Sequence, residues 1–277
     1  MTAWDHEGPT SPGDDGPGTI VRVSLSVYRY GPGGPARMLA VHGLTGHGKR
    51  WQTLATKHLP DVAIAAPDLL GHGRSSWAAP WTIDANVAAL GSLIQADGPM
   101  LVVGHSFGGA VALNLASARP DLVSGLVLLD PAVGLDGGWM RDIADDMFAS
   151  PDYTDRDEAH AEKASGSWDD VDPAELEAEL DEHLIPWPGG RVGWRISIPA
   201  MMSYWSELAR PIVLPRSGTP TTVVRAGRTD PPYTSEALIE ALDAGLGPDF
   251  RYVEFDCNHM VPLARPVETA AVIRERL

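Results

Sequence analysis

Cysteine, long apolar runs and basic residues are all scarce in this sequence. The single cysteine, Cys257, cannot form a disulfide within the chain, and no spacing of Cys and His typical of a metal site occurs. No apolar run approaches the ~20 residues that a membrane-spanning helix requires. The 21 Lys and Arg residues against 37 Asp and Glu residues give a net charge of −16. Because nucleic-acid binding requires a basic surface, we expect no nucleic-acid partner, and we expect no metal and no membrane span.

The acidity is concentrated in one segment of the chain. Between Arg141 and His183 the sequence holds 16 acidic and 3 basic residues, a net charge of −13, so the remainder is close to neutral. We interpret this segment as the solvated outer face of helices. The alternative is a negative field that repels anionic substrates.

Residues 1–18 are acidic and rich in Gly and Pro, and they lack the basic and apolar regions of a signal peptide. We therefore predict a disordered lead-in over 1–18 and a cytoplasmic protein. The 277 residues, 44% of them hydrophobic, are enough for a large core, which predicts one domain with an insertion.

Strand and helix patterns alternate along most of the chain. Short apolar runs predict buried strands, and apolar residues at helical spacing predict helices. The predicted strands cover residues 20–30, 37–41, 62–66, 100–104, 125–129, 222–227 and 251–255, and the predicted helices cover 51–58, 83–96, 235–244 and 266–277. This alternation predicts an α/β fold with a mostly parallel sheet covered on both faces, in which ligands bind beyond the carboxyl ends of the strands.

The alternation stops between residues 132 and 219. This stretch has helical patterns at 174–184 and 199–208. It also holds five of the nine tryptophans, which are Trp139, Trp168, Trp187, Trp194 and Trp205. We predict a helical insertion here, set into a core formed by residues 19–131 and 220–277.

The strongest chemical signal is the pentapeptide Gly104-His105-Ser106-Phe107-Gly108, which follows a buried strand pattern and precedes an Ala-rich helical stretch. In this setting G-x-S-x-G forms a sharp turn that presents a serine at the top of a sheet. Glycines are needed on both sides because a side chain would collide with the neighbouring strand and helix. The following helix points its positive end at the serine.

Further motifs follow in a characteristic order. Asp230 comes after the strand pattern at 222–227, and His259 lies near the C-terminus in C-N-H-M-V-P. His42 and Gly43 follow an earlier strand, and residues 68–75 carry D-x-x-G-x-G-x-S. With the order Ser, Asp, His, the chain resembles the serine α/β-hydrolases of the esterase and C–C hydrolase type, from about residue 20 to the end except for the insertion.

This resemblance implies a catalytic triad. Ser106 would be the nucleophile, His259 the general base, and Asp230 the carboxylate that holds the imidazole in the right tautomer. Asp130 is the alternative acid, because some members of the family carry the acid after the preceding strand. The backbone N–H groups of Leu44 and Phe107 would form the oxyanion hole.

The resemblance also implies an eight-stranded sheet with a helical cap, residues 132–219, inserted after the sixth strand as a lid over the site. The tryptophans of such a cap either pack the cap against the core or line an apolar or aromatic acyl pocket, to which large flat side chains are suited. The residues that we expect to line the substrate pocket are Trp139, Met201, Met202, Trp205 and Met260.

The function favoured by these residues is hydrolysis of a carboxylic ester with a small to medium apolar acyl group, on a small-molecule substrate and without a cofactor. Ser106 argues against the haloalkane dehalogenases and epoxide hydrolases of this fold, which use Asp as nucleophile. The alternatives are a C–C hydrolase, which usually has Trp where this chain has Met260, a thioesterase, and a slow-turnover ligand-binding signalling protein. The sequence leaves open whether the protein is a monomer or a homodimer.

Overall fold

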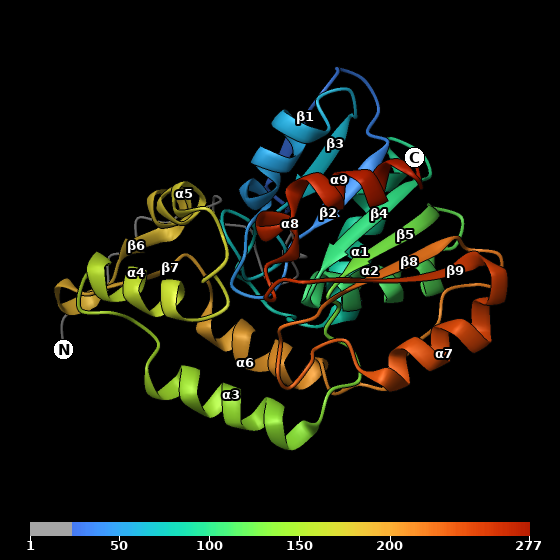
Figure 1. The fold of residues 1–277 in the computed structure, drawn as a ribbon. Coiled ribbons are helices and arrows are strands. Elements are labelled where there is room, and N and C mark those ends of the chain that lie inside the picture. Colours follow the sequence, from blue (N-terminus) through green and yellow to red (C-terminus); the bar gives the residue numbers. More distant parts are fainter. Residues whose placement is uncertain (1–23) are drawn as a thin grey trace, which may run out of the picture.

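A seven-stranded β-sheet forms the centre of the computed structural model, which describes residues 24–277 (Figure 1). Its strands lie in the order β1-β3-β2-β4-β5-β8-β9. They are β1 (Val27–Tyr30), β2 (Met38–Val41), β3 (Ile64–Pro67), β4 (Met100–His105), β5 (Val123–Leu129), β8 (Thr221–Ala226) and β9 (Phe250–Phe255). Only β1 pairs in antiparallel fashion, with β3, and the other neighbours in this sheet are parallel.

The predicted α/β fold with a mostly parallel sheet is confirmed, but the strand count differs. Eight strands were expected, and the sheet of residues 24–277 has seven. The predicted first strand over 20–30 corresponds to β1, which begins at Val27. Residues 20–23 and the predicted lead-in over 1–18 lie outside the described residues.

The central strands are apolar throughout because both of their faces are covered. Alternate residues point to opposite faces, so Leu39 and Val102 enter one hydrophobic core and Met38 and Leu101 enter the other. Every residue of β2 and β4 is buried. A continuous apolar run, rather than an alternating one, is the pattern that such strands require.

Helices cover both faces of the sheet (Figure 1). The buried residues of α1 (Ile83–Gln95), α2 (Phe107–Ala118) and α7 (Glu236–Leu246) belong to the first core. Those of η1 (Gly48–Trp51), η2 (Leu54–His58) and α9 (Pro266–Arg274) are mostly in the second. The short α8 (Val261–Ala264) and η4 (Gly247–Asp249) complete this part of the fold. Within residues 24–277, no helix is long and apolar enough to cross a membrane.

The chain between β5 and β8 forms its own group of elements, as the interrupted pattern predicts. These are α3 (Gly137–Ala149), α4 (Arg156–Ser165), α5 (Pro173–His183), β6 (Leu184–Pro186), η3 (Pro188–Gly190), β7 (Val192–Trp194) and α6 (Ile198–Glu207). A side-chain oxygen caps the N-terminus of each helix, from Asp136, Asp155, Asp172 and Ser197. The two three-residue strands, β6 and β7, were not predicted, because a pattern of three residues carries too little signal.

One tyrosine fixes the insertion to the core. Tyr204 of α6 is fully buried, and its hydroxyl donates to the carbonyl of Leu70 (3.0 Å) and accepts from the Asn86 side chain (2.8 Å). Its ring centroid lies 4.7 Å from that of Phe107, the residue after Ser106. A rigid polar and aromatic contact therefore holds α6 beside the start of α2.

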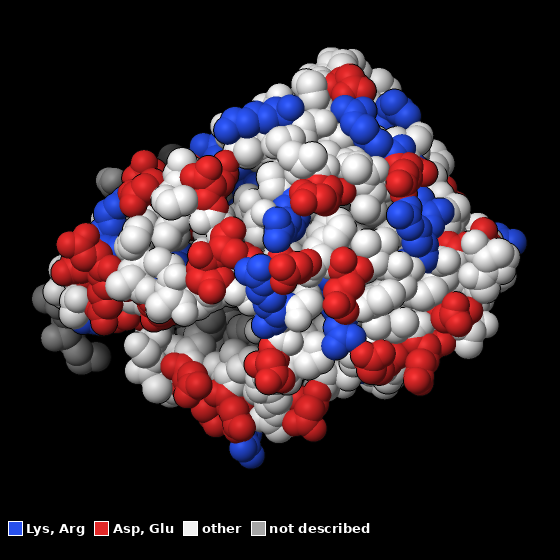
Figure 2. Space-filling view, viewed as in Figure 1, with Lys and Arg blue, Asp and Glu red and all other residues white. Residues whose placement is uncertain are grey.

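The acidic segment mostly faces solvent, as we interpreted it. On α3 and α5 the side chains of Asp145 and Asp181 are 76% and 74% exposed. Figure 2 shows Asp and Glu residues gathered over the outward surface of the insertion. Glu179 is the exception, because its side chain is only 2% exposed.

Close backbone packing explains two glycines of the G-x-S-x-G turn. A Cβ on Gly104 would lie 2.3 Å from the carbonyl oxygen of Gly108. A Cβ on Gly108 would lie 2.3 Å from the carbonyl oxygen of Val41 in β2. Both atoms struck are backbone, so α2 could not start this close to β4 and β2 with larger residues here.

We expect Gly104→Ala to lower the free energy of unfolding by about 3 kcal/mol, because the added methyl group must displace the backbone of Gly108. Urea denaturation followed by circular dichroism measures the loss. Gly33→Ala is the matched control, because a Cβ on Gly33 meets nothing within 4 Å. Equal stability of the two variants would contradict this account of the turn.

Candidate active site

Backbone strain marks the carboxyl ends of three neighbouring strands. In the part of the chain that the structure describes, the non-glycine residues with positive φ are Thr45 (57°), Ser106 (55°) and Asp130 (42°). They follow β2, β4 and β5, which are adjacent in the sheet. Such backbone costs roughly 1–3 kcal/mol per residue, and it concentrates at functional sites. This edge of the sheet is therefore the candidate position of the site.

Ser106 stands on the turn between β4 and α2, which confirms the predicted strand–turn–helix setting. Its N–H donates to the carbonyl of Leu129 (3.0 Å), and its own carbonyl accepts from Gly109 (2.8 Å) and Ala132 (3.1 Å). These bonds hold the strained backbone in place. The residue is 7% exposed and lines a cavity. The turn thus presents a largely buried serine to the cavity.

His259 lines the same cavity and is paired with a buried carboxylate. Its Nδ1 lies 2.6 Å from Oδ2 of Asp130. An ionised carboxylate can only accept a hydrogen bond, so Nδ1 is the donor and carries the proton. Nε2 of a neutral His259 is then an acceptor. This is the tautomer that a general base needs in order to take a proton from a serine.

The partner of His259 is Asp130, so the assignment of that role to Asp230 is wrong. Asp130 is fully buried, and its Oδ1 accepts from the Thr234 hydroxyl (2.9 Å) and from the N–H of Ala226 (3.2 Å). Asp230 is exposed on the loop after β8. The loop after β8 therefore does not supply the carboxylate that binds His259. It supplies Thr234, whose hydroxyl donates a hydrogen bond to that carboxylate.

Two buried histidines support the surrounding loops. His105 donates from Nε2 to the carbonyl of His259 (2.7 Å). His42 donates from Nδ1 to the carbonyl of Gly43 (2.8 Å), and its Nε2 accepts from the N–H of Leu69 (2.9 Å). Burial above all, and then the neighbouring histidine, holds the pKa of each well below its usual range. Both side chains are therefore neutral and shape the backbone around Ser106 and Gly43.

Two backbone N–H groups are open at the predicted oxyanion hole. Phe107 is the first residue of α2, so its N–H has no partner within the helix. Among the described residues, the N–H of Leu44 donates to no protein group either. Gly43 brings this loop close to the serine, because a Cβ there would lie 2.9 Å from Cβ of Ser106.

The cavity in front of Ser106 has a volume of about 150 Å³, whereas pockets for drug-sized ligands measure ~300–1,000 Å³. It is bounded by core loops and by residues of the insertion. The lining residues are Gly43, Leu44, Thr45, Arg50, His105, Ser106, Ser167, Trp168, Trp205, Tyr233, His259 and Met260.

Of the five residues predicted to line the pocket, Trp205 and Met260 do so. Met201 is fully buried in the core, and Met202 packs against it. Trp139 does not line the cavity. Its ring contacts the lining residue Tyr233, with centroids 5.2 Å apart. Only Trp205 and Met260 of this set can therefore touch a ligand in the cavity.

Tyr233, Trp168 and Arg50 are among the lining residues that were not predicted from the sequence. The Tyr233 ring lies over His259 with centroids 4.1 Å apart, and burial, followed by the charge of Asp130, raises the pKa of Tyr233. Trp168 comes from the insertion, and Arg50 from η1. The only signal for Arg50 in the sequence is that it follows soon after the His42-Gly43 motif. The chain after this motif contributes several residues to the cavity lining.

The insertion also touches the loop that carries His259. The N–H of Asn258 donates to Oδ2 of Asp170 (2.7 Å), while Oδ1 of Asp170 is buried without a partner in the described residues. The residue before His259 is thus held by a side chain of the insertion. A movement of the insertion at Asp170 would therefore shift the loop that carries His259.

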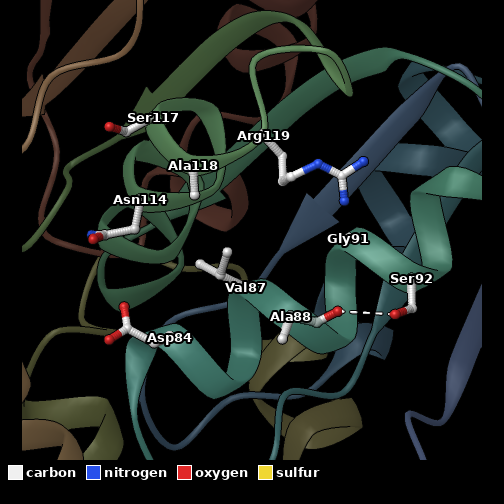
Figure 3. Close-up of a pocket in the computed structure, with 9 residues that line it drawn as sticks. All are labelled: Asp84, Val87, Ala88, Gly91, Ser92, Asn114, Ser117, Ala118 and Arg119. Atoms are coloured by element: carbon white, nitrogen blue, oxygen red, sulfur yellow. Dashed lines mark hydrogen bonds between the residues drawn. The ribbon is translucent and has the colours of Figure 1, made fainter.

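A larger hollow of about 480 Å³ lies between α1 and α2 (Figure 3). It shares no residue with the Ser106 cavity, and its lining includes no histidine or cysteine. The Ser92 hydroxyl there donates to the carbonyl of Ala88 (3.1 Å). This hollow therefore lacks a nucleophile paired with a base. Within residues 24–277, no group of three or more His, Cys, Asp and Glu side chains is arranged to hold a metal ion.

Comparison with known proteins agrees with this geometry. The profile of the Alpha/beta hydrolase family matches residues 38–272. Lipase LipV of Mycobacterium tuberculosis (strain ATCC 25618 / H37Rv) is 65% identical over 257 residues, which are 92% of this chain and 98% of LipV. Esterase Rv0045c of the same strain is 36% identical over 111 residues, which are 39% of this chain and 36% of the esterase.

Among solved structures, E-2-(acetamidomethylene)succinate hydrolase has a TM-score of 0.77 at 22% identity, covering 92% of this chain and 95% of that one. A marine microorganism esterase has a TM-score of 0.73 at 21% identity, covering 92% of this chain and all of the other. At such identity these structures show a shared fold. The profile match across most of the chain, together with the long match to LipV, shows that this protein belongs to the alpha/beta hydrolase family.

Proposed function

We propose that this hydrolase cleaves short carboxylic esters by way of an acyl-enzyme on Ser106. The observation that carries the proposal is the arrangement around one cavity. A strained serine and a histidine line it together, and Nδ1 of that histidine lies 2.6 Å from a buried carboxylate. The relatives named a lipase and an esterase support the choice of an ester bond.

In the first step Ser106 attacks the ester carbonyl. His259 Nε2 takes the hydroxyl proton as the bond forms, and the carboxylate of Asp130 stabilises the resulting imidazolium. Negative charge develops on the carbonyl oxygen, where the N–H groups of Leu44 and Phe107 would donate to it. Because these backbone donors are fixed before the reaction begins, they need little reorganisation in the transition state.

In the second step the tetrahedral intermediate collapses. His259 gives its proton to the departing alcohol, which leaves an acyl group on Ser106. Water then enters, His259 removes a proton from it, and the same sequence releases the carboxylic acid. In forming and in hydrolysing the acyl-enzyme, the same residue, His259, first accepts a proton and then donates it.

The insertion acts in this proposal as a lid. Trp168 and Trp205 close the cavity from that side, and Asp170 holds the His259 loop. A cavity of about 150 Å³ favours acyl chains of a few carbons over long ones unless the insertion moves. Within the small to medium range predicted from the sequence, we therefore expect short acyl groups to be preferred.

We expect hydrolysis of p-nitrophenyl esters to peak at acetyl to butyryl and to fall steeply toward palmitoyl, because the closed cavity is small. Ser106→Ala should remove nearly all turnover at every chain length, since the triad acts as a unit. Release of p-nitrophenol measures both. A maximum at palmitoyl would contradict the lid in this position, and full activity of Ser106→Ala would contradict the mechanism.

We expect Asp130→Asn to lower kcat by roughly 10⁴-fold, because an amide donates to Nδ1 and forces the wrong tautomer on His259. Asp230→Asn is the matched control and should leave kcat unchanged, since Asp230 is exposed. Steady-state kinetics with p-nitrophenyl acetate separate the two. A crippled Asp230→Asn beside an active Asp130→Asn would reverse the assignment of the acid.

A further inference from the structure

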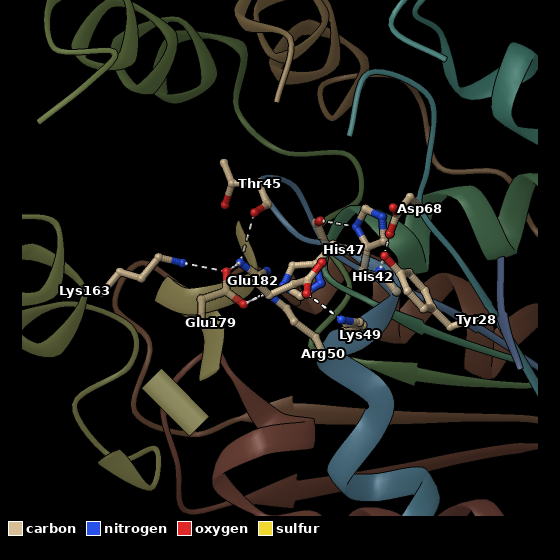
Figure 4. Close-up of polar contacts among 12 residues, drawn as sticks. Tyr28, His42, Thr45, His47, Lys49, Arg50, Asp68, Lys163, Glu179 and Glu182 are labelled. Atoms are coloured by element: carbon tan, nitrogen blue, oxygen red, sulfur yellow. Dashed lines mark hydrogen bonds and ion pairs between the residues drawn. The ribbon is translucent and has the colours of Figure 1, made fainter. Parts of the chain in front are cut away.

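A buried ionic cluster adjoins the cavity of Ser106 (Figure 4). At its centre is Glu179 of α5, the buried exception in the acidic segment. Glu179 Oε2 accepts from Nε of Arg50 (3.0 Å) and is 2.9 Å from Nε2 of His47. Its Oε1 accepts from Nη2 of Arg50 (2.5 Å) and from Lys163 (3.2 Å). All the lone pairs of one carboxylate are therefore in use.

Positive charge exceeds negative charge in this cluster. Arg50 and Lys163 are two cations that share the single carboxylate of Glu179, and their side chains are only 7% and 10% exposed. Burial first, and then nearby Arg50, lowers the pKa of Lys163 to about 8 even though Glu179 favours its charged form. Burial works to raise the pKa of Glu179, but Arg50, Lys163 and His47 together hold it well below its usual range.

Arg50 is the member of the cluster that reaches the cavity. Among these groups only Arg50 lines the cavity, together with Ser106 and His259. Its Nε and Nη2 bind Glu179, and Nη2 also donates to the carbonyl of Thr45 (3.0 Å). Among the described residues Nη1 has no hydrogen-bond partner, which leaves two N–H donors for a ligand.

The guanidinium of Arg50 is fixed in position. Gly46 packs against it, because a Cβ there would approach Nη1 to 2.7 Å. The ring of Trp168 also lies close, with its centroid 5.3 Å from Cζ. A side chain held in this way loses little conformational freedom when it binds an anion, and the two N–H groups of Nη1 can donate to a carboxylate oxygen.

The carboxylates that contact His259 and the loop before it have their own partners. Asp130 binds His259, Thr234 and Ala226, and Asp170 binds Asn258. The acidic outer surface repels anions at long range, but salt screens such charges beyond ~10 Å. At contact distance, the excess positive charge of the cluster and the free N–H donors of Arg50 favour an anion over a neutral group.

We infer that Arg50 is an anion-binding residue of the substrate cavity, and that the preferred substrates are short esters that carry a carboxylate besides the ester group. This inference rests on the proposed function, and it names the substrate class of the same site. The small volume agrees with it, because one short molecule must contact both Ser106 and Arg50.

Two pairs of matched esters test the inference in the wild-type protein. Monomethyl glutarate and the methyl ester of glutaramic acid differ only by a carboxylate in place of a carboxamide on the acyl side. Carboxymethyl butyrate and carbamoylmethyl butyrate place the same difference on the alcohol side. We expect kcat/KM to be about tenfold or more higher for the carboxylate in one of the pairs, the gain typical of a hydrogen bond to a charged group. No preference for the carboxylate in either pair would overturn the inference.

Variants then assign the preference to Arg50. In Arg50→Gln, Glu179 keeps Lys163 as its cationic partner, so no charge is left buried alone, and we expect the carboxylate preference to disappear. Arg74→Gln is the control, because Arg74 pairs with Glu182 nearby but does not line the cavity. It should keep the preference. A preference that survives in Arg50→Gln would show that another group binds the anion.

Binding without turnover separates this inference from the proposed function. Titration calorimetry on Ser106→Ala, with monomethyl glutarate and its carboxamide counterpart, needs no catalysis. Tighter binding of the carboxylate by about tenfold supports the anion site even if the wild-type protein hydrolyses no ester. Equal binding, together with active hydrolysis of neutral esters, overturns the anion site and leaves the esterase proposal standing.

Discussion

The site depends on the hydrogen bonds that the fully buried carboxylate of Asp130 accepts. A buried carboxylate is tolerated only when hydrogen bonds replace its lost hydration. Here those bonds come from His259, from Thr234 and from the N–H of Ala226 at the end of β8. The N–H of Asp130 in turn donates to the carbonyl of Val224 (2.6 Å). The acid is thus fixed to the sheet itself, and it brings the loops carrying Thr234 and His259 together.

A second buried carboxylate, Glu179, belongs to the insertion and has a different task. Its carboxylate binds Arg50 and His47 of the core and Lys163 of α4. Glu179 thereby joins the insertion to the loop beside the site. Asp130 sets the tautomer of His259, whereas Glu179 sets the direction of Arg50. Ser106 lies in a cavity that both carboxylates help to shape, one through His259 and the other through Arg50.

Most of the fold could be predicted because its signals are local. The apolar runs of β2 and β4, the G-x-S-x-G turn and the helical spacing of α1 each occupy one stretch of sequence. The choice between Asp130 and Asp230 could not be made in this way, because both follow strands of the same sheet and only the packing of His259 separates them. Glu179 was lost among exposed acids, although it shares a helical face with Leu176, Leu180 and His183, which are all buried. Its contact with Arg50 spans 129 positions, a distance at which local patterns carry no information.

The central claim is that Ser106, activated by His259 and Asp130, forms an acyl-enzyme. The most direct measurement is rapid mixing with p-nitrophenyl acetate, quenching in acid, and mass spectrometry of the peptides. The account predicts one acetyl group on the peptide that contains Ser106, formed in a burst with p-nitrophenol and greatly slowed in Asp130→Asn. An acetyl group on another residue, or turnover with no acetylated peptide under any quench time, would contradict it.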